Sequence, residues 1–290
     1  MKGIRNPDHG LSSVYTPGFW EQAWEELKQS FLAEHQTRHP DRWKTFYDLH
    51  GPFMREISGL DRGEAAQIVD RFLELGVVSE NQTVVDLGCG SGWLALPMAR
   101  KGMAVTAVDT STAMLAELEK RSSAQGLGSV VLRRCNWDDV EPAEPFDLAL
   151  AACFPPVLSP EGLLQMAVLG KTCALLLPDH LPGPSWTGRL WEALFGRRPF
   201  TGGRQLQTAV NYLMAAGKKP SLVSIRVPFT VNVPLEKALE YYAGYFSLFD
   251  RSGTETRAVI EKELLPFTKN GRITARGDLS YGLVWWAPSR

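Results

Sequence analysis

Three glycines at alternate positions follow an acidic residue in the segment 84–92, which reads Val-Val-Asp-Leu-Gly-Cys-Gly-Ser-Gly. The apolar residues before Asp86 predict a short strand, and residues 93–100 predict a helix. Because glycine has no Cβ, a strand–turn–helix of this kind lets a ligand approach the backbone closely. A dinucleotide fingerprint reads G-x-G-x-x-G, whereas these glycines are spaced G-x-G-x-G. The carboxylate ahead of them favours a ligand with a cationic end over one that presents a phosphate.

The segment 86–92 resembles the first motif of the class I S-adenosylmethionine-dependent methyltransferases. The resemblance implies methyl transfer as the reaction, with S-adenosyl-L-methionine as cofactor and S-adenosyl-L-homocysteine as product. It also implies that Asp86 lies near the amino end of the methionine moiety. The backbone of Gly88, Cys89 and Gly90 would lie against the cofactor.

A second acidic residue, Asp109, ends the next apolar run of the sequence. A carboxylate at this place can accept hydrogen bonds from both hydroxyls of a ribose, and NAD-binding proteins use the same arrangement. The segment 110–115 (Thr-Ser-Thr-Ala-Met-Leu) completes a resemblance to the second motif of the same family. This resemblance implies that Thr110 lies at the cofactor and that Met114 lies near the adenine. Helix capping by Asp109 and core packing of Met114 are the structural alternatives.

The segment 135–139 (Cys-Asn-Trp-Asp-Asp) follows the third expected strand. Many members of the family carry an acidic and then a small residue here, which pair with the adenine. This chain departs from that pattern with Asn136 and Trp137. The Asn136 carbonyl or the Asp138 carboxylate can accept from the adenine amine, and a backbone N–H can serve the ring nitrogen. The adenine contact is expected within residues 136–138, with the side chain left open.

The segment 146–156 (Phe-Asp-Leu-Ala-Leu-Ala-Ala-Cys-Phe-Pro-Pro) matches the fourth motif of the family, where a strand end borders both cofactor and substrate. The match implies that Ala152 touches the cofactor and that Phe154 touches the substrate. The segment 154–157 lacks both ends of the Asn/Asp-Pro-Pro-Tyr signature of amino-group methyltransferases, so that chemistry is not inferred. A rigid loop after the strand is the structural alternative.

The catalytic residue is left open by the sequence. Methyl transfer from a sulfonium is an in-line displacement, for which orientation and the exclusion of water supply much of the rate. A general base is needed only when the acceptor holds a proton at neutral pH. The candidate bases are Tyr47, His50, Asp179, His180, Tyr241 and Tyr242. No metal-binding spacing is visible, so no metal is expected.

The elements that position these residues alternate between strand and helix. The expected strands are Thr83–Leu87, Ala104–Val108, Ser129–Arg134, Phe146–Ala151 and Cys173–Leu177, and the expected helices between them are Gly92–Lys101, Thr112–Ala124 and Pro160–Leu169. Apolar strands that alternate with helices predict an α/β fold, a parallel sheet with helices on both faces. Ligands of such sheets bind at the carboxyl ends of the strands, where the motif glycines, Asp109 and Asn136 all fall.

The family resemblance extends this α/β fold to a doubly wound, mostly parallel, seven-stranded Rossmann-like sheet. The late strands, Ser221–Val231 and Ser280–Ala287, would supply its antiparallel pair. Residues 1–62 are expected to form an N-terminal arm and helical cap, with a helix at Phe19–Glu34. Residues 63–290 are expected to form the methyltransferase domain, with substrate-side insertions at about 183–216 and 234–268.

Aromatic residues gather towards both ends of the chain and allow two interpretations. They anchor a cap on the sheet, or they form a water-excluding lid over an apolar acceptor site. Small-molecule methyltransferases of the family commonly place an N-terminal helical segment over the cofactor, and residues 43–48 fit that position. The resemblance therefore implies a small-molecule methyl acceptor and a lid or substrate role for Tyr47.

The bulk composition limits the partners. The chain has 290 residues, 44% of them hydrophobic, as is ordinary for a soluble protein. Its net charge of −1 argues against a nucleic-acid partner. No signal-peptide core and no run near the roughly 20 apolar residues of a membrane span is visible, so a cytoplasmic location without a membrane partner is expected. The cysteines, which form no C-x-x-C pair, are expected to be buried reduced thiols: Cys89, Cys135, Cys153 and Cys173.

Two other functions stay open. One is an NAD-dependent oxidoreductase, against which the G-x-G-x-G spacing argues. The other is a non-enzymatic sensor or scaffold that retains the S-adenosylmethionine pocket.

Overall fold

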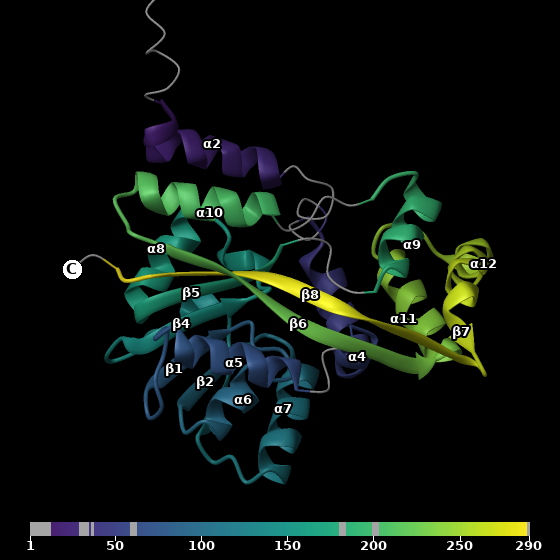
Figure 1. Cartoon of the computed structure of the whole chain (residues 1–290), viewed down its shortest axis with the longest axis horizontal. Helices are drawn as coiled ribbons and strands as arrows, with labels where there is room; N and C mark the ends of the chain where they lie inside the picture. The colour runs from purple at the N-terminus through teal and green to yellow at the C-terminus, as the bar shows by residue number, and fades with distance from the viewer. Residues whose placement is uncertain are drawn as a thin grey trace, which may run out of the picture.

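A central sheet with helices on both faces forms the molecule (Figure 1). The computed structural model describes residues 13–28, 35, 38–58, 63–179, 184–198 and 203–288. The strands are β1 (Thr83–Leu87), β2 (Ala104–Asp109), β3 (Val130–Arg134), β4 (Phe146–Ala152), β5 (Gly170–Pro178), β6 (Ser221–Pro234), β7 (Thr268–Lys269) and β8 (Arg272–Trp286). Their order in the sheet is β3-β2-β1-β4-β5-β8-β6, and the short β7 pairs with β8 off this path.

The first five strands run parallel, and β8 runs antiparallel to both β5 and β6. The chain proceeds from β1 outward to β2 and β3, then returns to place β4 on the other side of β1. This reversal creates a topological switch point between β1 and β4, which is where open α/β sheets bind ligands. The predicted fold, a doubly wound and mostly parallel α/β sheet closed by an antiparallel pair, is confirmed.

The last strand is much longer than the predicted Ser280–Ala287, because β8 begins at Arg272 and pairs with β6 along its whole length. Alternate residues of β6 from Ile225 to Val233 are buried, while those between them are more exposed. This period of two is typical of a strand with one covered face. The β6–β8 ribbon extends beyond the parallel strands, towards α11 and α12 (Figure 1).

The helices bury two hydrophobic clusters, one on each face of the sheet. Neighbouring residues of β1 alternate between them, since Val84 packs in the first cluster and Val85 in the second. The first cluster takes in α5, α6 and α7 together with α4, α9, α11 and α12, and the second takes in α2, α8 and α10. The helices are α2 (Pro17–Lys28), α4 (Pro40–Ser58), α5 (Glu64–Glu74), α6 (Ala95–Arg100), α7 (Thr112–Ala124), α8 (Pro160–Leu169), α9 (Trp186–Phe195), α10 (Gly203–Ala215), α11 (Leu235–Ser247) and α12 (Gly253–Leu264).

Two helix boundaries differ from the sequence prediction. The helix expected at Gly92–Lys101 begins only at Ala95, because Gly92 has a φ of +83°, which no right-handed helix accommodates. The helix expected at Phe19–Glu34 is α2 and is described as far as Lys28, while residues 29–34 lie outside the described residues.

The N-terminal helices α2 and α4 lie on opposite faces of the sheet, α4 in the first hydrophobic cluster and α2 in the second. Helix α2 packs on α10, and α4 packs against β6, α7 and α11. The division into a cap of residues 1–62 and a domain of residues 63–290 stays a prediction. In the described part of the chain, no helix has the length and apolar character to cross a membrane.

Candidate functional site

A cavity of about 760 Å³ lies at the carboxyl ends of β1, β2 and β4, at the switch point of the sheet. This volume is within the range of small-molecule sites. One side of the cavity is formed by the turns that follow β1 and β2. The other sides are formed by the end of β4 and by helices α2, α4 and α10.

The glycine turn after β1 forms part of one side of the cavity. Gly88 and Gly90 have φ values of +70° and +53°, a region that side chains disfavour. The N–H groups of Gly88 and Cys89 both donate to the Val108 carbonyl, at 2.9 and 3.0 Å, which ties the turn to β2. A Cβ on Gly88 would lie 2.1 Å from Phe154 Cδ2. A Cβ on Gly90 would meet only Met114 Sδ, which would lie 4.0 Å away. Gly90 therefore presents open backbone to the cavity.

Two carboxylates lie on this side of the cavity. Asp109 accepts from the Gly90 N–H at Oδ2 (2.9 Å) and from the Ser111 N–H at Oδ1 (2.8 Å). Asp86 is only 2% exposed, and burial raises its pKa to about 7. The nearby Asp109 charge adds to this rise, and a backbone hydrogen bond from Ala95 partly opposes it. Asp86 therefore gains its negative charge near neutral pH, where a cationic ligand group would favour the ionised form.

Replacement of Asp86 by asparagine is expected to stabilise the ligand-free protein at pH 8. The folded protein retains a proton on Asp86 up to about pH 7, while the unfolded chain loses it near pH 4. The contribution of Asp86 to stability therefore falls as the pH rises from about 4 to 7, and it stays lost above that. Because asparagine carries no charge, we expect a Tm about 3 °C higher than wild type at pH 8. At pH 3, where both states of wild type are largely protonated, the difference should vanish, and thermal melts at the two pH values test this.

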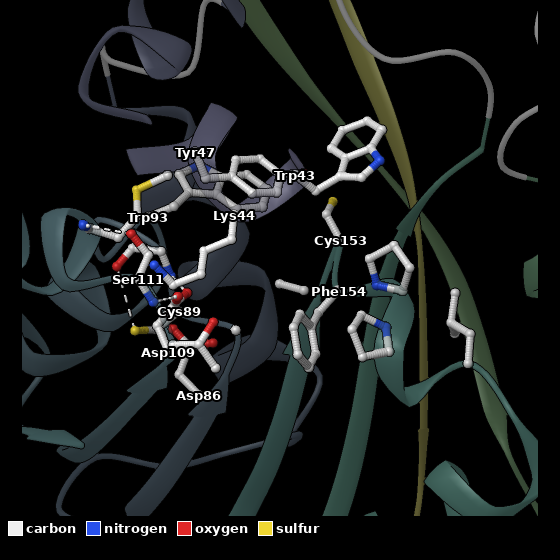
Figure 2. Close-up of a pocket in the computed structure, with 18 of the residues that line it drawn as sticks. Trp43, Lys44, Tyr47, Asp86, Cys89, Trp93, Asp109, Ser111, Cys153 and Phe154 are labelled. Carbon is white, nitrogen blue, oxygen red and sulfur yellow. Dashed lines mark hydrogen bonds between the residues drawn. The ribbon is translucent and has the colours of Figure 1, made fainter. Parts of the chain in front are cut away.

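The opposite side of the cavity is formed by the end of β4 and the loop after it. Figure 2 shows Asp86 and Asp109 close together on one side, with Cys153 and Phe154 across from them. Cys153 has a φ of +51°, and its N–H donates to the Leu176 carbonyl at 2.8 Å. The thiol opens onto the cavity, yet its desolvated surroundings raise its pKa to about 12. Burial first, then the Asp109 charge, raise the pKa of Tyr47 to about 12, so both groups keep their protons at neutral pH.

Most residues that the sequence assigned to the site line this one cavity. They come from segments far apart in the chain: Tyr47, Asp86, Gly88, Cys89, Gly90, Asp109, Thr110, Met114, Ala152 and Phe154. Their proximity is a finding of the structure, and their individual roles stay predictions.

The segment 136–138 does not line this cavity. The Asn136 amide donates to Asp139 Oδ2 at 3.2 Å, and the Asp138 carbonyl accepts from Gln165 Nε2 of α8 at 2.8 Å. Trp137 packs against the second hydrophobic cluster. A 3₁₀ turn at Trp137–Asp139 directs these groups towards α8. Their contact with adenine stays a prediction.

Of the candidate bases, Tyr47 alone lines the cavity in the described part of the chain. His50 and Tyr241 pack together between α4 and α11, and the Tyr242 hydroxyl accepts from Trp186 Nε1 at 2.8 Å. Asp179 accepts from the hydroxyls of Ser224 and Ser280 at 2.9 and 2.6 Å. His180 lies outside the described residues. Of the cysteines, Cys89 and Cys173 are buried as expected, whereas Cys135 is half-buried and Cys153 is exposed.

Several lining residues were not assigned to the site from the sequence: Trp24, Trp93, Ser111, Leu158 and Gln205. Trp43 and Lys44 also line the cavity, and they belong to the segment 43–48 that was expected to lie over the cofactor. Gln205 carries no signal in the sequence, because α10 reaches the cavity only through tertiary packing.

Comparison with known proteins identifies the central part of the chain. Residues 84–168 match the family model described as "Methyltransferase domain". The chain is 34% identical over 106 residues to the chloroplastic magnesium protoporphyrin IX methyltransferase of Arabidopsis thaliana, covering 35% of this chain and 33% of that protein. It is 37% identical over 103 residues to the ubiquinone biosynthesis O-methyltransferase of Caulobacter vibrioides, covering 34% and 37%. The chain thus spans about a third of the length of each of these two relatives.

Solved structures share the fold at low sequence identity. A putative methyltransferase from an antibiotic biosynthesis pathway of Anabaena variabilis aligns with a TM-score of 0.51 and 15% identity, over 76% of this chain and 96% of that one. A [4+2]-cyclase aligns with a TM-score of 0.50 and 18% identity, over 86% and 96%. These likenesses concern the fold alone.

Proposed function

We propose that the chain is a class I, S-adenosylmethionine-dependent methyltransferase that transfers a methyl group to a small apolar acceptor. The match of residues 84–168 to the methyltransferase family model supports this proposal. The observation that carries the proposal is one cavity with two unlike halves. The glycine turn and the two carboxylates form one half, and apolar side chains from α2, α4 and the loop after β4 form the other.

The residues of the first half suit the cofactor. The open backbone at Gly90 can lie against it, and Asp86 can pair with its amino group. Asp109 uses only part of its hydrogen-bonding capacity on two backbone N–H groups, so acceptor positions remain for the two hydroxyls of a ribose. The bound cofactor supplies an electrophilic methyl group on a sulfonium.

The residues of the second half suit an apolar acceptor. Trp24, Trp43, Pro155, Pro156 and Leu158 line it, and polar groups are few. These side chains can orient an acceptor and exclude water from the transfer, the two means by which such a site gains rate. Tyr47 and Phe154 come from different elements and both face this space, so they are the proposed contacts of the acceptor.

The proposal is tested by ligand binding followed by labelled transfer. Calorimetry is expected to show that the purified chain binds S-adenosylhomocysteine and does not bind NADH. With methyl-labelled S-adenosylmethionine and a cell extract, label should appear in the small-molecule fraction. Binding of NADH alone would contradict the cofactor assignment, and label confined to protein or nucleic acid would contradict the acceptor class. Binding without transfer to any fraction would favour the sensor or scaffold.

A further inference from the structure

Helix α4 belongs to both halves of the cavity. Its residues Trp43, Lys44, Tyr47 and Met54 line the cavity. The same helix packs against α7, whose first turn carries Met114, and against α11. Trp43 belongs, with Trp24, Pro155, Pro156 and Leu158, to the side of the cavity proposed to hold the methyl acceptor, here called the acceptor wall. Any shift of α4 therefore moves the acceptor wall.

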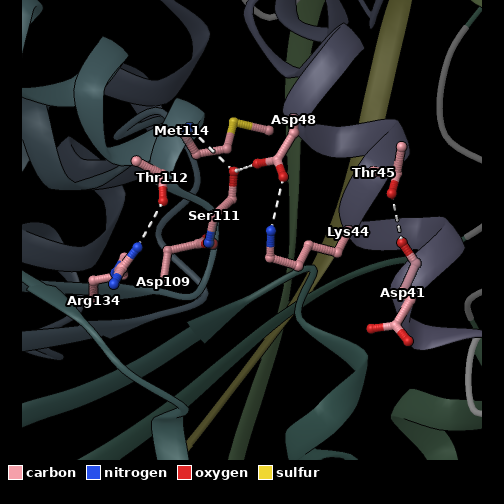
Figure 3. Close-up of polar contacts among 9 residues, drawn as sticks. All are labelled: Asp41, Lys44, Thr45, Asp48, Asp109, Ser111, Thr112, Met114 and Arg134. Atoms are coloured by element: carbon pink, nitrogen blue, oxygen red, sulfur yellow. Dashed lines mark hydrogen bonds and ion pairs between the residues drawn. The ribbon is translucent and has the colours of Figure 1, made fainter.

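Polar contacts tie α4 to the loop after β2 (Figure 3). Asp48 of α4 accepts a hydrogen bond from the Ser111 hydroxyl and pairs with Lys44 Nζ at 2.9 Å. The hydrogen bond from Ser111, followed by the one from Lys44, holds the pKa of Asp48 below its usual value, so Asp48 is ionised at neutral pH. Ser111 is only 3% exposed. A charged acceptor on a buried hydroxyl makes this a strong contact between two elements distant in sequence.

Ser111 also holds two of the proposed cofactor contacts, Asp109 and Met114. Its N–H donates to Asp109 Oδ1 at 2.8 Å, and its hydroxyl oxygen accepts from the Met114 N–H at 3.2 Å. Hydrogen bonds thus connect Asp48 of α4, through Ser111, to Asp109, the residue proposed to bind the ribose.

Helix α4 is closely packed around this contact. A Cβ on Gly51 would lie 2.2 Å from Met114 Cε, so the helix backbone lies directly against the Met114 side chain. On the other side of α4, His50 Nε2 would lie 2.5 Å from a Cβ on Gly244 of α11. The position of α4 and the position of the cofactor loop are therefore set together.

We propose that Asp48 is a positioning residue that couples the two halves of the site, so that a bound cofactor fixes α4 and thereby forms the acceptor wall. This proposal rests on the proposed function. A ligand that orders the loop after β2 also orders α4 through Ser111 and Asp48. By linkage, the acceptor and the cofactor then strengthen each other's binding.

The test combines S-adenosylhomocysteine titration with amide hydrogen exchange of residues 40–58. In the wild type, S-adenosylhomocysteine is expected to slow exchange both in the glycine turn at 88–92 and in α4. In Asp48→Ala, the Kd for S-adenosylhomocysteine should rise about fivefold, and the slowing in α4 should be lost while that in the glycine turn remains. Asp48→Asn keeps one acceptor oxygen and should give an intermediate result. Asp41→Ala, on the same helix, is the matched control. The backbone carbonyl of Asp41 accepts a hydrogen bond from Thr45 Oγ1, and the substitution keeps that carbonyl.

The outcomes separate this proposal from the proposed function. If the wild type does not bind S-adenosylhomocysteine, both are wrong. If the wild type binds it but Asp48→Ala behaves like Asp41→Ala in Kd and exchange, the coupling is wrong and the function stands. If Asp48→Ala lowers the melting temperature yet keeps the ligand-induced slowing in α4, Asp48 is merely structural and the coupling is again wrong.

Discussion

Replacement of Asp109 by alanine is expected to weaken S-adenosylhomocysteine binding by roughly 30- to 150-fold, or about 2–3 kcal/mol. This variant removes the charged acceptor that we propose for the two ribose hydroxyls. The N–H groups of Gly90 and Ser111 also lose the oxygens to which they donate at 2.9 and 2.8 Å. The turn after β1 and the loop after β2 are thus released together. Isothermal calorimetry with S-adenosylhomocysteine measures the effect.

Two companion variants make the Asp109 result specific. Asp109→Asn retains an acceptor oxygen and is expected to lose less affinity than Asp109→Ala. Asp70→Ala, in which a surface carboxylate of α5 that pairs with Lys101 is removed, is expected to leave the affinity unchanged. An Asp109→Ala protein that binds S-adenosylhomocysteine as tightly as wild type would refute the ribose assignment.

Replacement of Gly88 by alanine is expected to destabilise the fold by about 2–5 kcal/mol. Its φ of +70° disfavours any side chain, which contributes about 1–2 kcal/mol. In addition, the new Cβ would lie 2.1 Å from Phe154 Cδ2, and overpacking of this kind costs about 1–3 kcal/mol. Thermal or urea unfolding of the ligand-free protein measures the loss.

The two contributions at Gly88 can be separated by further variants. Gly76 has a similar φ of +67° with no atom within 4 Å of the Cβ position, so Gly76→Ala should show the backbone contribution alone. In Gly88→Ala/Phe154→Ala the clash is relieved, so Gly88→Ala should be milder in the Phe154→Ala background than in wild type. If Gly88→Ala lowers the free energy of unfolding no more than Gly76→Ala does, the contact with Phe154 is not the reason why position 88 requires glycine.

The meeting of the residues assigned to the cofactor at one cavity could be predicted, because the geometry that brings them there is largely local. The glycine turn needs positive φ values at Gly88 and Gly90, and only a short stretch of sequence is required to show this. Asp86 and Asp109 follow from the same logic, since each belongs to a parallel strand whose carboxyl end must face the same edge of the sheet. The boundaries of β1 and α7 were predicted correctly for the same reason.

Predictions that depended on distant packing fared less well. The segment 136–138 lies after a strand end as expected but does not line the cavity, and the Asp138 carbonyl accepts a hydrogen bond from Gln165 of α8, so its contact with adenine stays a prediction. The start of β8 at Arg272 was missed, because its pairing partner in β6 is separated from it by two helices in the sequence. Burial of Cys153 was also expected and is not found, since its thiol faces a cavity that only the assembled fold encloses.

The sequence by itself determined the α/β class, the order of its strands and helices, and the residues offered to the cofactor. These features depend on apolar periodicity and on backbone conformations that few residue types allow. The tertiary structure alone decided the acceptor wall, the Asp48–Ser111 contact and the entry of Gln205 into the cavity. These contacts join segments far apart in the chain, and their energies depend on burial and close packing, which appear only when the elements meet.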